Sequence, residues 1–175
     1  ANRLVIASFD AGSAVSTIQR FLSLSRNGKS FASATRLIIS QRLVRRLADD
    51  KISHTLNSSE LASLGKIANL DKVLSILKQE KIVSPGATWS EIEFYKPESD
   101  LENDGYVGEL LIAEILSINQ AWKDLIIQGA TLSEFKKLFE LEGNLTILED
   151  ALIKAVQGLT SLSEIFSLTS LELNK

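Results

Sequence analysis

The feature that most constrains this chain is a series of helix-start signals in its last third. Thr131-x-x-Glu134, Thr146-x-x-Glu149 and Ser161-x-x-Glu164 each match the capping box, in which two side chains three residues apart satisfy free N–H groups at a helix start. Gly129, Gly143 and Gly158 follow three of the apolar stretches, and glycine tolerates the left-handed backbone that commonly ends a helix. The sequence therefore predicts helices over residues 119–128, 131–141, 146–157 and 161–166.

The first fifty residues combine one extended pattern with two helical ones. The short apolar run Leu4–Ser8, followed by turn-forming residues, predicts a strand buried beside another strand. Apolar spacing over residues 18–26 predicts a helix that is ended by Asn27-Gly28. Apolar residues from Phe31 onward also follow the helical period, which predicts a second helix, capped by Ser30 and reaching Asp50.

The middle of the chain has shorter patterns. A helix capped by one of the serines at its start is predicted over residues 58–64, and an amphipathic helix over residues 70–81. Apolar and polar residues alternate over residues 89–95, which predicts a strand, and residues 97–105 form an acidic, turn-rich loop. The apolar stretch over residues 106–116 fits a buried strand running into a short helix, and periodicity alone does not separate the two.

Composition excludes several classes of site. Nineteen basic against 22 acidic side chains give a formal charge of −3, which argues against a general polyanion binder. With no cysteine there is no disulfide, thiolate zinc site or iron–sulfur cluster. No apolar run approaches the ~20 residues of a membrane span. The chain lacks methionine altogether, including an initiator, and we therefore expect it to be a fragment or a processed product.

No complete active site can be read from the residues. The phosphate loop GxxxxGK[ST] and the motif GxGxxG are both absent from the sequence, so we assign no catalytic residue. The single histidine, His54, is expected at the surface. The carboxylates of the acidic loop do not match the calcium-binding EF-hand pattern, so we predict a solvated loop without a metal; they are Glu98, Asp100, Glu102 and Asp104.

The strongest charged feature is a cluster of Arg42, Arg45 and Arg46. One interpretation is a solvated helix face. The other is a surface that pairs with carboxylates of a neighbouring subunit or with a phosphate, because guanidinium groups bind both in a bidentate manner. The residues themselves do not decide between the two.

Five segments together resemble the C-terminal part of the hexameric ATPases of type II secretion and type IV pilus assembly. RLVIASF at residues 3–9 resembles the strand before the family's histidine box, HLVLSTLHTNDA. The run from Ile18 through QRLVRRL at residues 41–47 resembles IxRL…ASS…QRLVRRL. The remaining three are residues 105–116, which resemble GYxGRxxIxExL, residues 125–130, which resemble LI..GA, and residues 148–165, which resemble LxxDxxxKVxxGxTSxEEV.

The chain departs from the family pattern at three places. The histidine box would place His, Thr, Asn and Asp at the positions of Asp10, Ala11, Gly12 and Ser13. The arginine of GYxGR is Glu109. The family's four-cysteine zinc motif cannot exist in a chain without cysteine, so the resemblance predicts no zinc here.

The resemblance implies an α/β fold that is mostly α. Residues 1–50 would be the C-terminal piece of a RecA-like nucleotide domain with one or two strands, residues 51–104 a variable insert, and residues 105–175 a helical C-terminal subdomain. Ser8 and Asp10 would lie next to the nucleotide. Arg42, Arg45 and Arg46 would be candidates for the contact between subunits.

The same resemblance implies a role in a motor. ATP and Mg²⁺ would act in a preceding part of the parent protein, and we expect these 175 residues alone not to hydrolyse ATP. The partners would be other copies in a hexameric ring and a platform protein of the inner membrane, with neither nucleic acid nor a membrane span. The location would be cytoplasmic, peripheral at the inner membrane of a bacterium. Replacing Arg45 and Arg46 by Glu should disturb the ring while this piece stays folded.

Two alternatives remain open. A diverged relative could serve as a non-catalytic interaction module, which the lost histidine box favours. The chain could also be a helical adaptor unrelated to the family.

Overall fold

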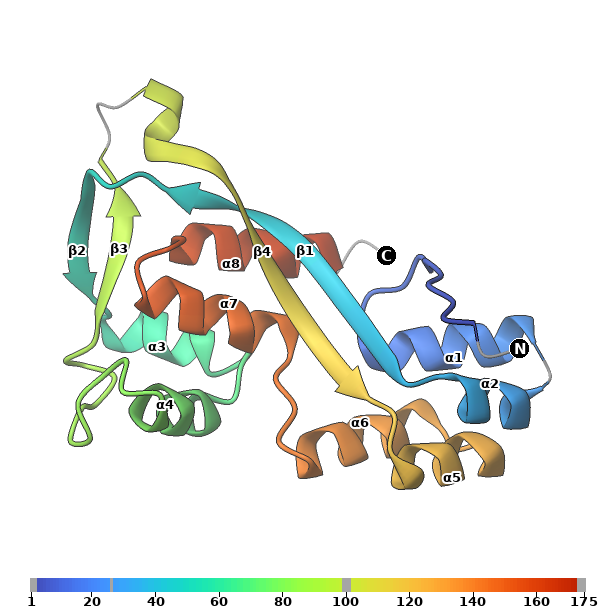
Figure 1. Ribbon diagram of the computed structural model, residues 1–175. Helices are drawn as coiled ribbons and strands as arrows, with labels where there is room; N and C mark the ends of the chain where they lie inside the picture. Colours follow the sequence, from blue (N-terminus) through green and yellow to red (C-terminus); the bar gives the residue numbers. More distant parts are fainter. Residues whose placement is uncertain (1–2, 26, 99–101, 173–175) are drawn as a thin grey trace. The chain divides into compact units, whose positions relative to one another are not determined.

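The structure is a computed structural model that describes residues 3–25, 27–98 and 102–172 (Figure 1). In chain order its elements are α1 (Ala14–Leu24), α2 (Gly28–Ala34), β1 (Leu37–Leu47), β2 (Lys51–Thr55), α3 (Ser58–Leu64), α4 (Leu70–Gln79), β3 (Glu93–Pro97), η1 (Glu102–Gly105), β4 (Tyr106–Ser117), α5 (Gln120–Gln128), α6 (Leu132–Leu141), α7 (Ile147–Val156) and α8 (Leu162–Glu172). The fold is thus α/β with mostly helical regular structure, as predicted.

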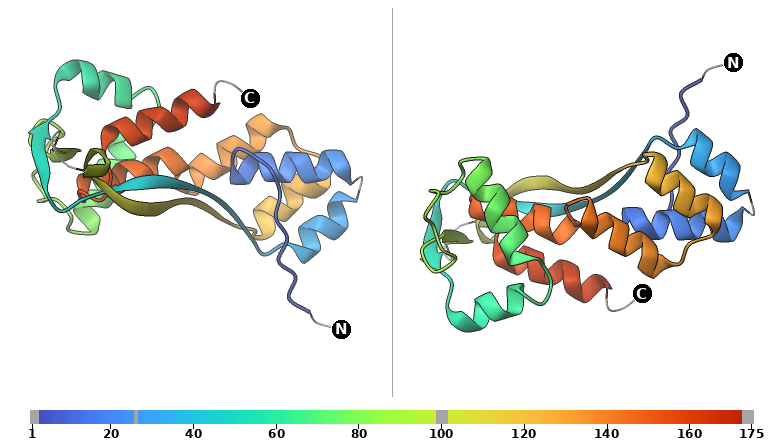
Figure 2. Two further views of the ribbon diagram at one scale, coloured as in Figure 1. Left: turned by 90° about the horizontal axis from the view of Figure 1, so that it is seen from above. Right: turned by 90° about the horizontal axis from the view of Figure 1, so that it is seen from below.

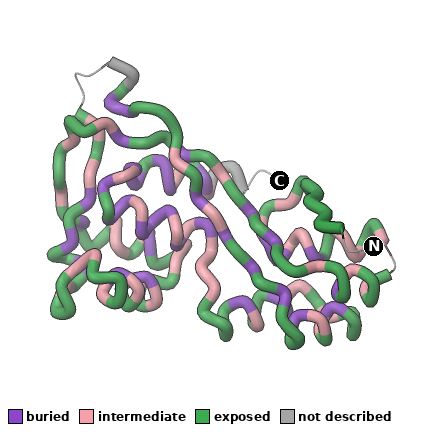
Figure 3. Tube along the Cα trace, viewed as in Figure 1, coloured by how far each residue is buried: buried purple, intermediate pink, exposed green. Residues whose placement is uncertain are grey.

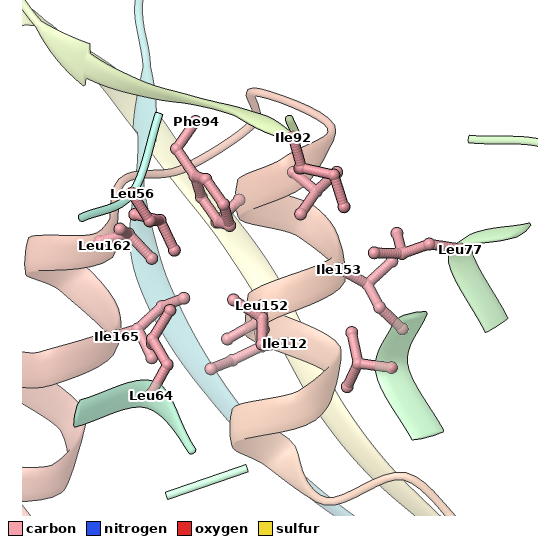
Figure 4. Close-up of a cluster of buried hydrophobic side chains, with 14 of the residues drawn as sticks. Leu56, Leu64, Leu77, Ile92, Phe94, Ile112, Leu152, Ile153, Leu162 and Ile165 are labelled. Atoms are coloured by element: carbon pink, nitrogen blue, oxygen red, sulfur yellow. The ribbon is translucent and has the colours of Figure 1, made fainter. Parts of the chain in front are cut away.

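The chain forms two compact units, each with its own hydrophobic core. The described parts of residues 1–40 and 114–144 make up unit 1, and those of residues 41–113 and 145–175 make up unit 2. In unit 1, α2 packs against α5 and α1 against α6, around a core that includes Trp122 and Phe135. In unit 2, α7 packs against α4, α8 and β3, and its core includes Phe94 and Leu152 (Figure 4).

Helix α7 is central to unit 2. Seven of its ten residues are buried, which makes it the spine on which the other elements of the unit pack (Figure 3). Its buried Glu149 forms an ion pair with Lys72 of α4 and accepts a hydrogen bond from the Asn69 N–H, 3.2 Å away. These contacts join the N-terminal ends of α4 and α7.

The strands form two separate two-stranded sheets. β2 and β3 pair antiparallel, with His54 opposite Phe94. β1 pairs with β4, and Figure 1 shows the two running in opposite directions. β4 is a strand throughout Tyr106–Ser117, which settles the strand-or-helix ambiguity of this stretch in favour of a strand.

The helices of the last third follow their predicted signals closely. Thr131 and Thr146 form complete capping boxes, and Gly129 ends α5 in the left-handed conformation. Two predicted details are wrong. Helix α8 continues to Glu172, well past the predicted end at residue 166. The Glu164 carboxylate does not return to the start of α8 but bonds to Arg45.

The predicted helix from Phe31 to Asp50 is wrong. α2 ends at Ala34 and is capped by Asn27 rather than Ser30, and β1 takes up the rest, so the arginine cluster lies on a strand. Apolar residues of this stretch fit both periods, but three of the four buried residues, Ile38, Ser40 and Val44, lie an even number of positions apart, as on one face of a strand. The fourth, Leu47, lies at the end of the strand on the other face. Pairing with β4, which lies far away in sequence, decides the outcome.

The predicted buried strand at Leu4–Ser8 is also wrong. Residues 3–10 have no regular structure, and Leu4, Val5 and Ile6 are 80–91% exposed. Figure 2 shows this segment leading away from α1. An apolar strand needs a neighbour to satisfy its backbone, and none of the described strands lies beside it.

Smaller differences concern the middle of the chain. Helix α3 is present as predicted, and α4 ends at Gln79, two residues before the predicted end. The strand predicted over residues 89–95 forms only as β3, from Glu93 to Pro97. Part of the acidic loop, including Asp100, lies outside the described residues. No helix in the described part of the chain is both long and apolar enough to cross a membrane.

Candidate functional site: the motif junction

Polar side chains from three segments of the family pattern bond along the outer edges of β1 and β4 in unit 2. We call these residues the motif junction, which has two separate parts. At the outer edge of β4 are Asp150 and Lys154, and the part beside Arg45 consists of Arg45, Tyr106, Thr160, Ser161, Ser163 and Glu164. α7 contributes Asp150 and Lys154, β1 and β4 contribute Arg45 and Tyr106, and α8 with the loop before it contributes the rest.

The outer edge of β1 is closed at Arg45 and Leu47. The Arg45 N–H donates to Glu164 Oε2 at 2.8 Å, and the Arg45 carbonyl accepts from Thr160 Oγ1 at 2.8 Å. The Leu47 N–H donates to the Leu159 carbonyl at 2.9 Å. Because an unpaired strand edge invites pairing with another chain, these bonds protect this end of β1.

The guanidinium of Arg45 is held by the same carboxylate. Its Nε donates to Glu164 Oε1 at 3.0 Å and its Nη2 lies 2.9 Å from that oxygen, while the group stacks 4.0 Å from the centre of the Tyr106 ring. The hydrogen bond to Glu164 raises the pKa of Arg45 above its ordinary value. Glu164 is nearly buried, whereas the Arg45 side chain is 51% exposed.

Beside the arginine lies a cluster of three hydroxyls, in which Tyr106 and Ser161 are buried and Ser163 is exposed. The Tyr106 hydroxyl is 2.7 Å from Ser161 Oγ and 3.2 Å from Ser163 Oγ, and the two serine oxygens are 2.6 Å apart. Ser161 Oγ also accepts from the Glu164 N–H at 3.4 Å. The first residue of β4 is thereby joined to the start of α8.

The outer edge of β4 is closed in the same manner by α7. The Ala113 N–H donates to Asp150 Oδ2 at 2.8 Å, and Lys154 Nζ donates to the Leu111 carbonyl at 2.8 Å. Asp150 and Lys154, four residues apart on α7, form an ion pair at 2.6 Å. The carboxylate of Asp150 thus satisfies one outward N–H of β4, and the ammonium group of Lys154 satisfies one outward carbonyl.

Gly158, between α7 and α8, has a geometry that only glycine accommodates without strain. Its φ is +71°, and a Cβ placed there would lie 2.9 Å from the Tyr95 ring. Lys51 Nζ donates to the Gly158 carbonyl at 2.7 Å. This tight turn brings Thr160 and Glu164 to the edge of β1.

The structure separates the residues singled out from the sequence. Only Arg45 lies in the motif junction; Arg46 is exposed, and Arg42 is half-buried with its Nη1 donating to the Gln41 carbonyl at 3.0 Å. Ser8 and Asp10 are exposed and belong to unit 1. The site residues that sequence reasoning missed are Tyr106 of β4 and those on α7, on α8 and in the loop before α8. For Asp150 and Lys154, their spacing of four residues was the available signal.

His54 differs from its predicted surface position. It is half-buried, and its Nδ1 makes no hydrogen bond within the described residues. Its ring lies 6.5 Å from that of Phe94.

Unit 2 also has an open hollow of about 540 Å³ beside β3. It is lined by side chains of the segment before β3, by β3 itself and by the end of α7: Ile82, Val83, Ser84, Gly86, Ala87, Glu91, Ile92, Glu93, Tyr95 and Val156. Hydrogen bonds from Thr88 lower the pKa of Glu91. Within the described residues, no three side chains of the metal-binding types gather in a way that could hold a metal ion.

Comparison with known proteins agrees with the motif pattern. The family described as "Type II/IV secretion system protein" matches residues 3–167. The chain is 26% identical over 167 residues to a type II secretion system protein E of Xanthomonas campestris. It is 27% identical, also over 167 residues, to a type IV pilus assembly ATPase PilB of Thermus thermophilus.

These matches cover 95% of this chain but 27% and 17% of the two relatives, so the chain spans at most about a quarter of their length. The match includes every residue of the motif junction. The chain therefore belongs to the type II/IV secretion system protein family.

Proposed function

We propose that this chain is the C-terminal region of a secretion or pilus-assembly motor ATPase and that it contributes subunit packing and ring assembly. The observation that carries the proposal is the motif junction, in which family segments distant in sequence bond to one another. The named relatives are a secretion protein and pilus assembly ATPases.

In this proposal ATP hydrolysis belongs to a preceding part of a longer protein. Phosphoryl transfer needs groups that hold Mg²⁺ and the phosphates, and the phosphate loop does not occur in these 175 residues. The exposed run Leu4–Ser8 would complete the sheet of a RecA-like nucleotide domain, with Ser8 and Asp10 near the nucleotide. Its exposure supports this, because an apolar strand gains most from being covered.

The subunit contact is proposed for the arginines of β1. Arg46 is the best candidate because it is exposed and is not held by the motif junction. Arg45 is less suited to the test, since Arg45→Glu would place a second carboxylate beside Glu164. Other copies in a hexameric ring, and a platform protein of the inner membrane, are the proposed partners.

The test uses the longer protein that contains these residues. We expect Mg²⁺-dependent ATP hydrolysis and a hexameric mass by light scattering. Arg46→Glu should reduce both, while Lys137→Glu, the same charge change at an exposed position of α6, should leave both unchanged. An intact hexamer in Arg46→Glu would contradict the interface. Absence of a phosphate loop and of ATP hydrolysis would favour the non-catalytic interaction module instead.

A further inference from the structure

The buried face of β4 carries one charged side chain, that of Glu114. Ile112 and Leu116, two positions to either side, share this face because side chains alternate along a strand, and both are fully buried. Glu114 itself is only 5% exposed. Burying a carboxylate is unfavourable unless hydrogen-bond donors replace the water that it loses. The structure supplies such a donor from a distant part of the chain.

The donor is the first residue of α1. The Ala14 N–H donates to Glu114 Oε1 at 2.8 Å, and both residues are buried and belong to unit 1. This N–H is one of those that a helix cannot satisfy by itself, and this end of a helix attracts negative charge. The capping box of Ser13 and Ser16 serves the N–H groups of these two serines. Glu114 thus satisfies an N–H that the capping box does not reach.

The bond joins two segments of the family pattern that are 100 positions apart. Residues 10–13, which directly precede Ala14, stand at the histidine-box positions, and Glu114 is the glutamate of the segment that resembles IxExL. A capping box fixes where a helix begins along the chain, whereas a bond to β4 also fixes where that beginning lies within the unit. On the other side of residues 10–13, the Phe9 ring packs edge-on against the Phe21 ring of α1, with centroids 5.7 Å apart. The turn is therefore held at both of its ends.

We propose that Glu114 is a positioning residue that holds the turn at residues 10–13 in place, and Asp10 with it. This role rests on the proposed function, which puts Asp10 near the nucleotide. Glu114 does not touch the nucleotide in this proposal but acts through the Ala14 amide. Its effect falls on the rate of hydrolysis more than on nucleotide affinity, because small displacements beside the reacting groups cost rate steeply.

Amide exchange on the 175-residue chain tests whether Glu114 holds the turn. Glu114→Leu keeps a similar volume but removes the acceptor, and it should speed exchange of the Ala14 amide about tenfold. Glu114→Gln keeps a side-chain oxygen at the same reach and should retain most of the protection. Ile126→Val, which trims one methyl group from the same core, should leave the Ala14 amide unchanged. Protection of Ala14 that survives Glu114→Leu would overturn the proposal.

A second variant covers the case in which Glu114→Leu does not fold. Glu114→Asp keeps the charge but withdraws the carboxylate by one methylene, so it should also speed exchange of the Ala14 amide. Unchanged protection in this variant would equally overturn the proposal.

ATP hydrolysis by the longer protein tests the consequence. Glu114→Leu should lower kcat about tenfold while KM changes by less than about twofold. Glu114→Gln should restore most of kcat, and Ile126→Val should match the parent. Light scattering should show the same hexameric mass for the parent and these variants. Loss of the hexamer in Glu114→Leu would assign Glu114 to ring assembly and overturn the positioning role.

The failure of this proposal can be told apart from the failure of the proposed function. An active parent whose Glu114→Leu variant keeps its kcat would refute the positioning role and leave the proposed function standing. A parent that does not hydrolyse ATP would refute the proposed function, and the positioning role with it.

Discussion

The two units use the same two strands differently. In unit 2, the outer edge of β1 is closed at Arg45–Leu47 by Glu164 of α8 and by the loop before α8, and the outer edge of β4 is closed at Leu111–Ala113 by two side chains of α7. In unit 1, the start of β1 has no such cover within the described residues, and its apolar side chains are half exposed. The outward backbone groups of the strands are therefore satisfied only where specific polar residues reach them. These polar residues lie in the segments that resemble the family pattern.

The largest expected effect on stability comes from substitutions in the separate hydrophobic cores of the two units. Leu152→Ala should lower the free energy of unfolding by about 3 kcal/mol, because it leaves a cavity at a fully buried position of unit 2. Amide exchange should rise in β2, β3 and α8 while α5 and α6 keep their protection. Phe135→Ala in unit 1 should give the reverse pattern. If both variants exposed the same amides, the two units would unfold as one.

The closure of β1 gives the next largest effect. Glu164→Ala should cost about 2 kcal/mol, since it leaves the Arg45 N–H without its acceptor. Glu164→Gln keeps an acceptor and should cost less. Urea unfolding measures both, and the exchange rate of the Arg45 amide should rise only in the alanine variant. Equal losses in the two variants would show that the charge, not the backbone bond, matters.

The closure of β4 is expected to contribute less, because Asp150 and Lys154 remain partly exposed. Asp150→Ala should cost about 1 kcal/mol and speed exchange at Ala113 without affecting Arg45. Asp150→Asn should preserve much of the protection at Ala113. Faster exchange at Arg45 in Asp150→Ala would mean that the two edges are not closed independently.

The smallest expected effect on stability concerns Glu142 of unit 1, which follows the last residue of α6. Its carboxylate accepts hydrogen bonds within this unit. Burial raises its pKa, but hydrogen bonds from Trp122, Asn119 and Asn144 outweigh burial and lower it overall. This stabilisation is present above the ordinary glutamate pKa of about 4.3 and is lost as the pH falls through the lower value of the folded state.

We therefore expect the melting temperature of the parent chain to fall more steeply below about pH 4.3 than that of Glu142→Gln. Because Glu142 is exposed and water screens its charge, the difference in unfolding free energy should stay below about 1 kcal/mol. Parallel curves for the two proteins over this range would contradict the assignment.

Sequence signals correctly predicted those helix ends that are fixed by bonds between residues close in sequence. Thr131 and Thr146 each cap a helix with partners three residues away, and Gly129 ends a helix by its own backbone freedom. The same reasoning predicted that the Glu164 carboxylate would cap its own helix, but it bonds to Arg45, more than one hundred positions away in sequence. Its Ser-x-x-Glu spacing was correct as a helix start but said nothing of the edge of β1.

By itself, then, the sequence determined the helices of the last third, the α4 helix and membership of the family, because capping, periodicity and motif order are written in neighbouring residues. Tertiary structure decided that residues 37–47 are a strand, that Leu4–Ser8 stays uncovered, and that Glu164 bonds to Arg45 of β1 and Asp150 to Ala113 of β4. The physical reason is that a strand is completed by a partner, and the partner of β1 lies about seventy residues away in sequence, beyond the reach of any local pattern.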